Sequence, residues 1–216
     1  MEKISEYAYI KYKDGLFEIK NTKPSEDTVK AWNYLLDNFK ELEGVKNIEI
    51  HFKNFDHITD DEIEVFSNLL EQNTSFESVA LNFEGCPNIA DSGINDLAEV
   101  LKSMKKLKRI ELTVGNELIS DYSIEVLGAA AAECPNLESV GFIFIGCPDI
   151  SDEGFQNYME NISKMKSLTN LKIGFHSCEN ITDFSITTIF SNKKLIQNLS
   201  GLGLEFKDSA LTKEAM

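Results

Sequence analysis

The sequence contains very little arginine: of its 21 basic residues, only Arg109 is an arginine. Its 36 acidic residues give a formal net charge of −15. DNA, RNA and anionic membranes are bound through clusters of lysine and arginine, so this balance disfavours all three as partners. It also argues against an arginine-dependent phosphate or nucleotide site, whereas it permits a basic protein partner.

Long apolar runs are missing as well. No stretch approaches the roughly 20 apolar residues that a membrane-spanning helix needs, and the N-terminus is charged throughout, without the apolar core of a secretory signal. We therefore expect a cytoplasmic protein that neither spans nor binds a membrane.

The short motifs of common enzyme classes are also absent. The sequence has no Walker-A run, no His-Glu-x-x-His and no Gly-x-Ser-x-Gly. The pair Gly201 and Gly203 superficially resembles a dinucleotide-binding loop, but it lacks a third glycine and falls within an expected strand. We expect no catalytic residues, no metal and no cofactor, and hence no enzyme.

What the sequence does contain is a repeat. Apolar anchor residues recur at steps of 31, 31, 30, 31 and 31 residues, and behind each anchor the apolar residues alternate with period two, which is typical of a half-buried strand. The anchors are Val45, Phe76, Leu107, Leu137, Leu168 and Leu199. The strands are expected at residues 48–52, 79–83, 110–114, 140–144, 171–175 and 202–206.

A second recurring element follows each of the first five strands. It is an isoleucine, then a small or hydroxylated residue, then an aspartate, and it opens a segment with helical apolar spacing. Hydroxyl residues and aspartates suit helix N-termini, and Thr59 with Glu62 fits a capping box. Each unit is therefore strand, loop, helix, with parallel strands joined by right-handed crossovers. Because one unit cannot bury its own apolar face, the units must stack.

These residues resemble the cysteine-containing leucine-rich repeat, whose pattern runs through Cys134-Pro-Asn-Leu137, Cys147 and Ile150-Ser-Asp152. The unit length is similar to that of the ribonuclease-inhibitor type. The resemblance covers about residues 45–206 and implies an α/β leucine-rich-repeat solenoid, an arc with a concave parallel β-sheet and convex helices. Two departures are Phe55, in place of the first loop cysteine, and a one-residue deletion near Gly115.

The ends of the chain differ from the repeats. Residues 1–44 are expected to form a cap: a β-hairpin at 5–20 that turns at residues 13–15, and a helix near 25–42 in the slot of a degenerate first repeat. One stripe of this helix holds Val29, Trp32, Leu35, Leu36 and Phe39. Residues 45–216 then hold five full repeats plus a final partial one, all in a single domain.

The residues after Phe206 are too few for a crossover helix. Either they form a short turn, or the strand from Leu202 to Phe206 is an open edge that invites pairing with another chain. Dimerisation through this edge is therefore a hypothesis.

Cysteine and histidine offer the few candidates for chemistry. Cys86, Cys147 and Cys178 recur at one repeat position, which favours a structural ladder of thiols bonded to loop backbone over a metal site or a disulfide. His51 and His176 are expected on the concave face about 19 Å apart, at roughly 4.8 Å per strand, so they cannot share a metal. These two histidines, and His57 in a loop, are interpreted as solvated rather than catalytic.

The concave face is the expected binding surface. The fourth strand has no polar residue, so Ile143 and Ile145 should be exposed beside bare backbone, as an apolar patch rimmed by polar groups. Alternatively, strand propensity placed these isoleucines there, or a terminal segment covers them. The candidate partner-binding residues are Arg109, Glu111, Thr113, Gly141, Ile143, Ile145, Lys172, Gly174 and His176.

Because nearly the whole chain is repeat, we predict a non-enzymatic protein–protein interaction module, a scaffold or subunit of a larger assembly such as a cytoskeletal or ciliary structure. The alternative is a regulator of an enzyme, because the family that the repeats resemble includes GTPase activators and inhibitors beside ubiquitin-ligase receptors and actin-capping proteins.

Overall fold

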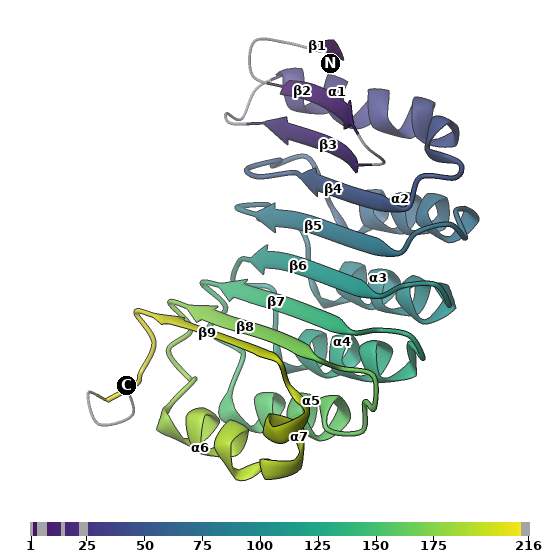
Figure 1. The fold of residues 1–216 in the computed structure, drawn as a ribbon. Helices are drawn as coiled ribbons and strands as arrows, with labels where there is room; N and C mark the ends of the chain where they lie inside the picture. Colours follow the sequence, from purple (N-terminus) through teal and green to yellow (C-terminus); the bar gives the residue numbers. More distant parts are fainter. Residues whose placement is uncertain (1, 4–7, 14–15, 22–25, 213–216) are drawn as a thin grey trace.

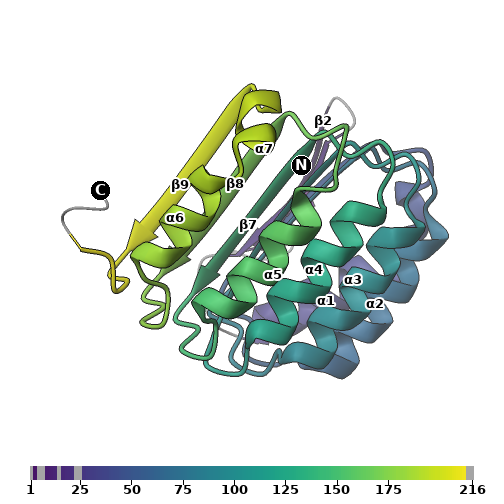
Figure 2. The same cartoon turned by 90° about the horizontal axis from the view of Figure 1, so that it is seen from below.

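The computed structural model describes residues 2–3, 8–13, 16–21 and 26–212. Its strands form a single nine-stranded sheet in chain order, and the helices cover one face of it (Figures 1 and 2). Strands β1 to β3 pair antiparallel, and every neighbouring pair from β3 to β9 is parallel. The predicted α/β solenoid, with an open parallel sheet and helices on the other side, is confirmed.

The elements have the following bounds. The strands are β1 (Glu2–Lys3), β2 (Ala8–Lys13), β3 (Leu16–Asn21), β4 (Asn47–His51), β5 (Ser78–Glu84), β6 (Arg109–Gly115), β7 (Ser139–Ile145), β8 (Asn170–His176) and β9 (Gly201–Lys207). The helices are α1 (Glu26–Asn38), the 3-10 turn η1 (Phe39–Leu42), α2 (Asp60–Gln72), α3 (Asp91–Ser103), α4 (Asp121–Glu133), α5 (Asp152–Ile162), α6 (Asp183–Ser191) and α7 (Lys193–Asn198).

The strand register reproduces the sequence period, because equivalent residues of successive units lie side by side. Ile48 lies opposite Val79, and Val79 lies opposite Ile110. Strand β3 joins at the same 31-residue step, with Ile19 opposite Ile50. The second arm of the expected hairpin is thus the strand of the first unit, and β1 and β2 lie outside it. The expected turn at residues 14–15 lies outside the described residues.

Aromatic side chains fill the space between sheet and helices. Trp32 of α1 meets the ring of Phe52 edge-on, with centroids 5.1 Å apart, and Phe52 stacks on Phe83 at 5.0 Å. Helix α1 therefore continues the helical layer, as a degenerate first unit requires. Val29, which we had placed on its apolar stripe, is instead 41% exposed.

The aspartate at the start of each helix from α2 to α6 hydrogen-bonds to the segment that follows one repeat later. Asp121 accepts hydrogen bonds from the backbone N–H of Ser151 at 2.7 Å and from the Ser151 hydroxyl at 2.6 Å. That hydroxyl also accepts from the N–H of Glu153, so the carboxylate is linked to the next helix terminus, where negative charge is favourable. The same row, here named the aspartate ladder, joins Asp60 to Ala90, Asp91 to Ser120, Asp152 to Thr182 and Asp183 to Thr212.

The third residue of a helix that follows a ladder aspartate has to be small. A Cβ atom on Gly154 would lie 2.1 Å from Oδ1 of Asp121, because the carboxylate occupies that space. Where the third residue is serine, its hydroxyl donates to the carboxylate instead: Ser123 to Asp91 and Ser185 to Asp152. The small third residue in the recurring Asp-x-Gly or Asp-x-Ser pattern is therefore explained by its contact with the aspartate of the preceding unit.

The loop cysteines are buried and bond to backbone. Cys86 Sγ donates to the carbonyl oxygen of Phe52, directly after β4 in the preceding unit, at 3.0 Å, and Cys178 Sγ lies 3.7 Å from the equivalent oxygen of Phe144. In the shortened third unit, Asn116 bonds the preceding loop instead: its amide donates to the carbonyl oxygens of Cys86 and Ile89 at 2.9 and 2.8 Å. All four cysteines of the chain are free thiols.

The Tyr158 hydroxyl is one of three buried side-chain groups without a hydrogen-bond partner among the described residues, with His57 Nε2 and Ser67 Oγ. Tyr158 is fully buried, and its hydroxyl makes no hydrogen bond among the described residues. An unsatisfied buried hydroxyl carries a desolvation penalty. We expect Tyr158→Phe to raise the free energy of unfolding by ~1 kcal/mol, measured by urea denaturation.

The control for this substitution is Tyr122→Phe, because the Tyr122 hydroxyl is exposed and donates to Asn95 at 3.1 Å. That variant should gain no stability. A loss of stability in Tyr158→Phe would mean that the buried hydroxyl is satisfied in solution.

Candidate protein-binding face

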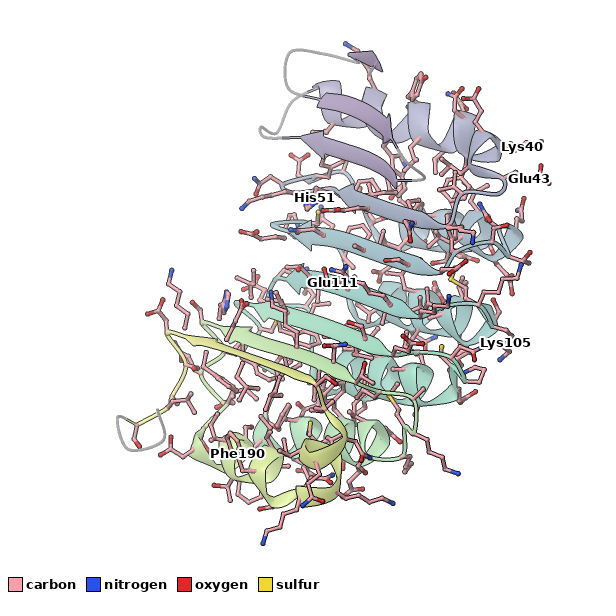
Figure 3. The ribbon with its side chains drawn as sticks, viewed as in Figure 1. Lys40, Glu43, His51, Lys105, Glu111 and Phe190 are labelled. Atoms are coloured by element: carbon pink, nitrogen blue, oxygen red, sulfur yellow. The ribbon has the colours of Figure 1, made fainter. Side chains whose placement is uncertain are left out.

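The sheet face opposite the helices carries rows of charged and polar side chains from successive strands (Figure 3). The side chains pair within and between strands. Arg109 Nη2 lies 2.6 Å from Glu111 Oε1, and His51 Nε2 lies 2.8 Å from Glu49 Oε1. The side chains in these pairs are partly exposed, so a polar group of a ligand can replace one member of a pair.

Glu205 joins two of the predicted binding residues. Its carboxylate lies 2.8 Å from Lys172 Nζ and 3.5 Å from His176 Nε2. The hydrogen bond from Lys172 lowers the pKa of Glu205 below its usual value. We had not counted Glu205 among the binding residues, although it lies in the next strand at the column of Ile143 and Gly174.

The predicted apolar patch on β7 is only partly exposed. Ile143 and Ile145 are only half-exposed, and Gly141 and Gly174 are buried. The reason is that each side chain leans over a neighbouring glycine: a Cβ on Gly174 would lie 3.2 Å from an Ile143 methyl carbon, and one on Gly115 2.8 Å from Ile145 Cβ. The isoleucines fill space that glycines leave free, so the patch is less exposed than strand alternation alone predicts.

A hollow of 670 Å³ lies instead at the N-terminal ends of β6 to β9. Its floor includes small residues, Ser139, Gly201 and Gly203, between the longer side chains of Arg109 and Lys172, and the Asn170 side chain lies over Gly201. Of the predicted set, the hollow collects Arg109, Glu111 and Lys172. Its lining does not include Gly141, nor the residues that lie farther along the strands: Thr113, Ile143, Ile145, Gly174 and His176.

One rim of the hollow is an ion ladder that sequence reading missed. Glu77 lies 2.7 Å from both Lys46 Nζ and Lys108 Nζ, and Lys108 lines the hollow together with Glu138. The hydrogen bonds from Lys108 and then Lys46 lower the pKa of Glu77 to about 2. The signal was present in the sequence, because these four residues alternate in charge at the repeat period just before each strand.

The remaining candidates for chemistry have structural surroundings. Burial raises the pKa of Cys86 to about 12 and that of Cys134 to about 11, so these thiols stay protonated. A hydrogen bond between Cys178 and Cys147 raises the pKa of Cys147, as does burial. Within the described residues, no group of three or more His, Cys, Asp or Glu is placed to hold a metal ion.

His57 does not fit our interpretation as a solvated histidine. Its Nδ1 lies 3.3 Å from the Thr28 hydroxyl of α1, and its Nε2 is buried without a partner among the described residues. Burial lowers its pKa, against the opposing charge of Asp56. His57 therefore belongs to the contact between the first unit and the second. None of the described helices combines the length and apolar character needed to cross a bilayer.

The fold, the 31-residue register and the hollowed sheet face define this protein as a leucine-rich-repeat solenoid. Among solved structures it is similar to one described as "Leiomodin-1 Actin-Binding Site 2 (ABS2)", with a TM-score of 0.58 and 18% sequence identity over 81% of this chain and 92% of that one. No family model and no curated protein matches the sequence. At this identity the likeness shows the fold, and the ribonuclease-inhibitor-like subtype stays a prediction.

Proposed function

We propose that this chain is a non-enzymatic protein-interaction module that holds a segment of a protein partner in the hollow of its concave face. The observation that carries the proposal is the hollow itself, a space of 670 Å³ with charged side chains around a floor of glycine and serine. Small floor residues let a partner's backbone approach the strands closely. Charged groups around such a floor supply specificity.

The charges of the hollow favour an acidic or mixed-charge segment. Its lining holds three cationic residues, Lys108, Arg109 and Lys172, and two anionic ones, Glu111 and Glu138. The chain as a whole has a net charge of −15, so this is a place where a partner's carboxylate meets cations. Arg109 can donate two parallel hydrogen bonds to such a carboxylate in place of its hydrogen bond to Glu111.

We further propose a role as a scaffold or subunit of a cytoplasmic, cytoskeletal assembly. One solved structure similar to this chain is named as an actin-binding site, which makes actin the first partner to test. The measurement is co-sedimentation with actin filaments, together with binding to labelled monomeric actin.

Two matched double variants test whether the partner binds at the hollow. Arg109→Glu with Lys172→Glu should weaken binding about tenfold or more, because arginine anchors near the centre of an interface carry much of its energy. The control is Lys105→Glu with Lys166→Glu, which makes the same change in charge at two exposed lysines outside the lining; Figure 3 shows Lys105 far from Glu111. The control should bind within about twofold of the parent protein.

If actin does not bind, a photo-crosslinking amino acid at Ser139 on the floor of the hollow, compared with one at Lys105, identifies the partner by mass spectrometry. A partner that crosslinks only from position 105, or that binds the hollow and control variants equally well, would refute the proposed site.

A further inference from the structure

The edge strands at the two ends of the sheet differ in length. At the N-terminal end the sheet closes with β1, a strand of two residues, and short edge strands are a protection against pairing with other chains. At the other end β9 has seven residues and no proline, and within the described part of the chain no strand pairs with its outer edge (Figure 1). The outer edge of β9 therefore offers a template for another strand.

The apolar side chains at this end are incompletely covered. Leu202, Leu204 and Phe206 are only half-buried, whereas their equivalents one strand earlier are fully buried: Leu171, Ile173 and Phe175. Helix α6 adds Phe190, which is 54% exposed on the last helical layer (Figure 3). The same eighth helical position is buried in the earlier units: Ser67, Ala98, Gly128 and Met159. Phe190 thus occupies a position that a following unit covers elsewhere in the molecule.

The free backbone groups of β9 follow from its pairing with β8. Gly201 donates its N–H to Thr169, and Lys207 accepts from the N–H of Ser177. In a parallel pair, alternate residues direct both N–H and C=O to the same neighbour. The groups that point to the outer edge therefore belong to Leu202, Leu204 and Phe206.

We propose that a second copy of this chain pairs with the edge, through an antiparallel β9–β9 contact with a two-fold axis at Leu204. In this register Leu204 lies opposite Leu204 of the second copy, and Leu202 lies opposite its Phe206. Every outward N–H and C=O of these residues then has a partner, because all of them fall in hydrogen-bonded pairs.

The side chains of β9 are self-complementary in the same register. On the helical side, leucine meets leucine and Leu202 meets Phe206, which are favourable cross-strand pairs. On the concave side, Gly203 lies opposite Glu205 and Gly201 opposite Lys207, so no like charges face each other. The two-fold axis also brings the exposed Phe190 of both copies to one side of the joined sheet.

The first test is the mass of the full chain by light scattering and sedimentation equilibrium over a range of concentrations. We expect a monomer of 24.3 kDa to give way to a dimer as concentration rises. Moderate salt should favour the dimer, because it screens repulsion between two chains of charge −15. A monomer at every concentration would overturn the proposal, as would open-ended larger oligomers, which indicate head-to-tail contacts.

The matched variants are Gly203→Glu and Gly203→Lys. A Cβ at Gly203 would meet Lys172 Cγ at 3.4 Å, an ordinary contact, so the monomer accommodates both side chains. Gly203→Glu places two glutamates opposite Glu205 and its copy, which should raise the dimer dissociation constant about tenfold. Gly203→Lys places a lysine opposite Glu205 of the second copy, so the dimer dissociation constant should stay unchanged or fall. If both variants respond alike, the register is wrong.

Amide hydrogen exchange supplies an independent measurement. The N–H groups of Leu202, Leu204 and Phe206 should become protected as concentration rises, whereas those of Gly201, Gly203 and Glu205 are bonded to β8 at any concentration. A dimer without this alternating protection would place the interface elsewhere.

Discussion

Replacing Phe175 with alanine is expected to lower the free energy of unfolding by about 3–5 kcal/mol, the usual range for truncating a buried phenylalanine. The ring is fully buried. It stacks on Phe144 with centroids 5.6 Å apart and meets the edge of Phe155 at 5.4 Å. Its removal opens a cavity that faces both the strand and the helix of the preceding unit, so two sets of contacts between units are lost together.

The measurement is urea or guanidinium denaturation followed by far-ultraviolet circular dichroism. The matched control is Phe184→Ala, which removes the same atoms from a side chain that is 52% exposed and should cost less than about 1 kcal/mol. Phe175→Leu should fall between the two. If Phe175→Ala and its control had the same midpoint, the aromatic column would not hold the units together.

Asp152→Ala is expected to cost about 2–3 kcal/mol, which is large for a single polar side chain. The Asp152 carboxylate accepts from the Thr182 N–H at 3.0 Å, from the Thr182 hydroxyl at 2.5 Å and from the Ser185 hydroxyl at 2.5 Å. Ser185 is fully buried, so without its acceptor it becomes an unsatisfied buried donor. The loss therefore combines hydrogen bonds to a charged group with a desolvation penalty.

Two further variants separate the ladder from a general effect of charge. Asp152→Asn keeps one acceptor oxygen and the shape of the side chain, so its cost should be intermediate. Asp149→Ala removes an exposed aspartate three residues earlier and should change stability by less than about 0.5 kcal/mol. Equal losses for Asp149→Ala and Asp152→Ala would show that net charge, not the ladder, sets the stability.

The repeat architecture was predictable because its signal is local and periodic. Apolar alternation at a step near 31 residues gave the strands, and the Ile-x-Asp element gave the helix starts. The capping box at Thr59 and Glu62 is also present. What the sequence could not supply were contacts between units. The ladder aspartates were assigned to their own helices, because nothing in one unit indicates that the acceptor serves a donor about 30 residues later.

The candidate binding face was predicted only in part, for a related reason. Exposure of Ile143 and Ile145 was inferred from strand alternation alone, which fixes the face but not the neighbours. How exposed a side chain is depends on the residues of the neighbouring strands. Here Gly174 and Gly115 leave space that Ile143 and Ile145 occupy. The hollow needs small residues on β7 and on β9 at once, on the two sides of β8, a coincidence that the columns of aligned residues contain but that no single strand reveals.

The aspartate ladder also makes the amino acids of successive units interdependent. Helix α2 illustrates this, because the unit before it has Val29 in place of a ladder aspartate, and its own third residue is the large Glu62. For the four ladder aspartates that precede another helix of the ladder, Asp60, Asp91, Asp121 and Asp152, the residue 32 or 33 positions later is glycine or serine. Relatives of this protein should therefore covary at this separation. A unit moved to a new place in the array must arrive with a third residue suited to the unit before it.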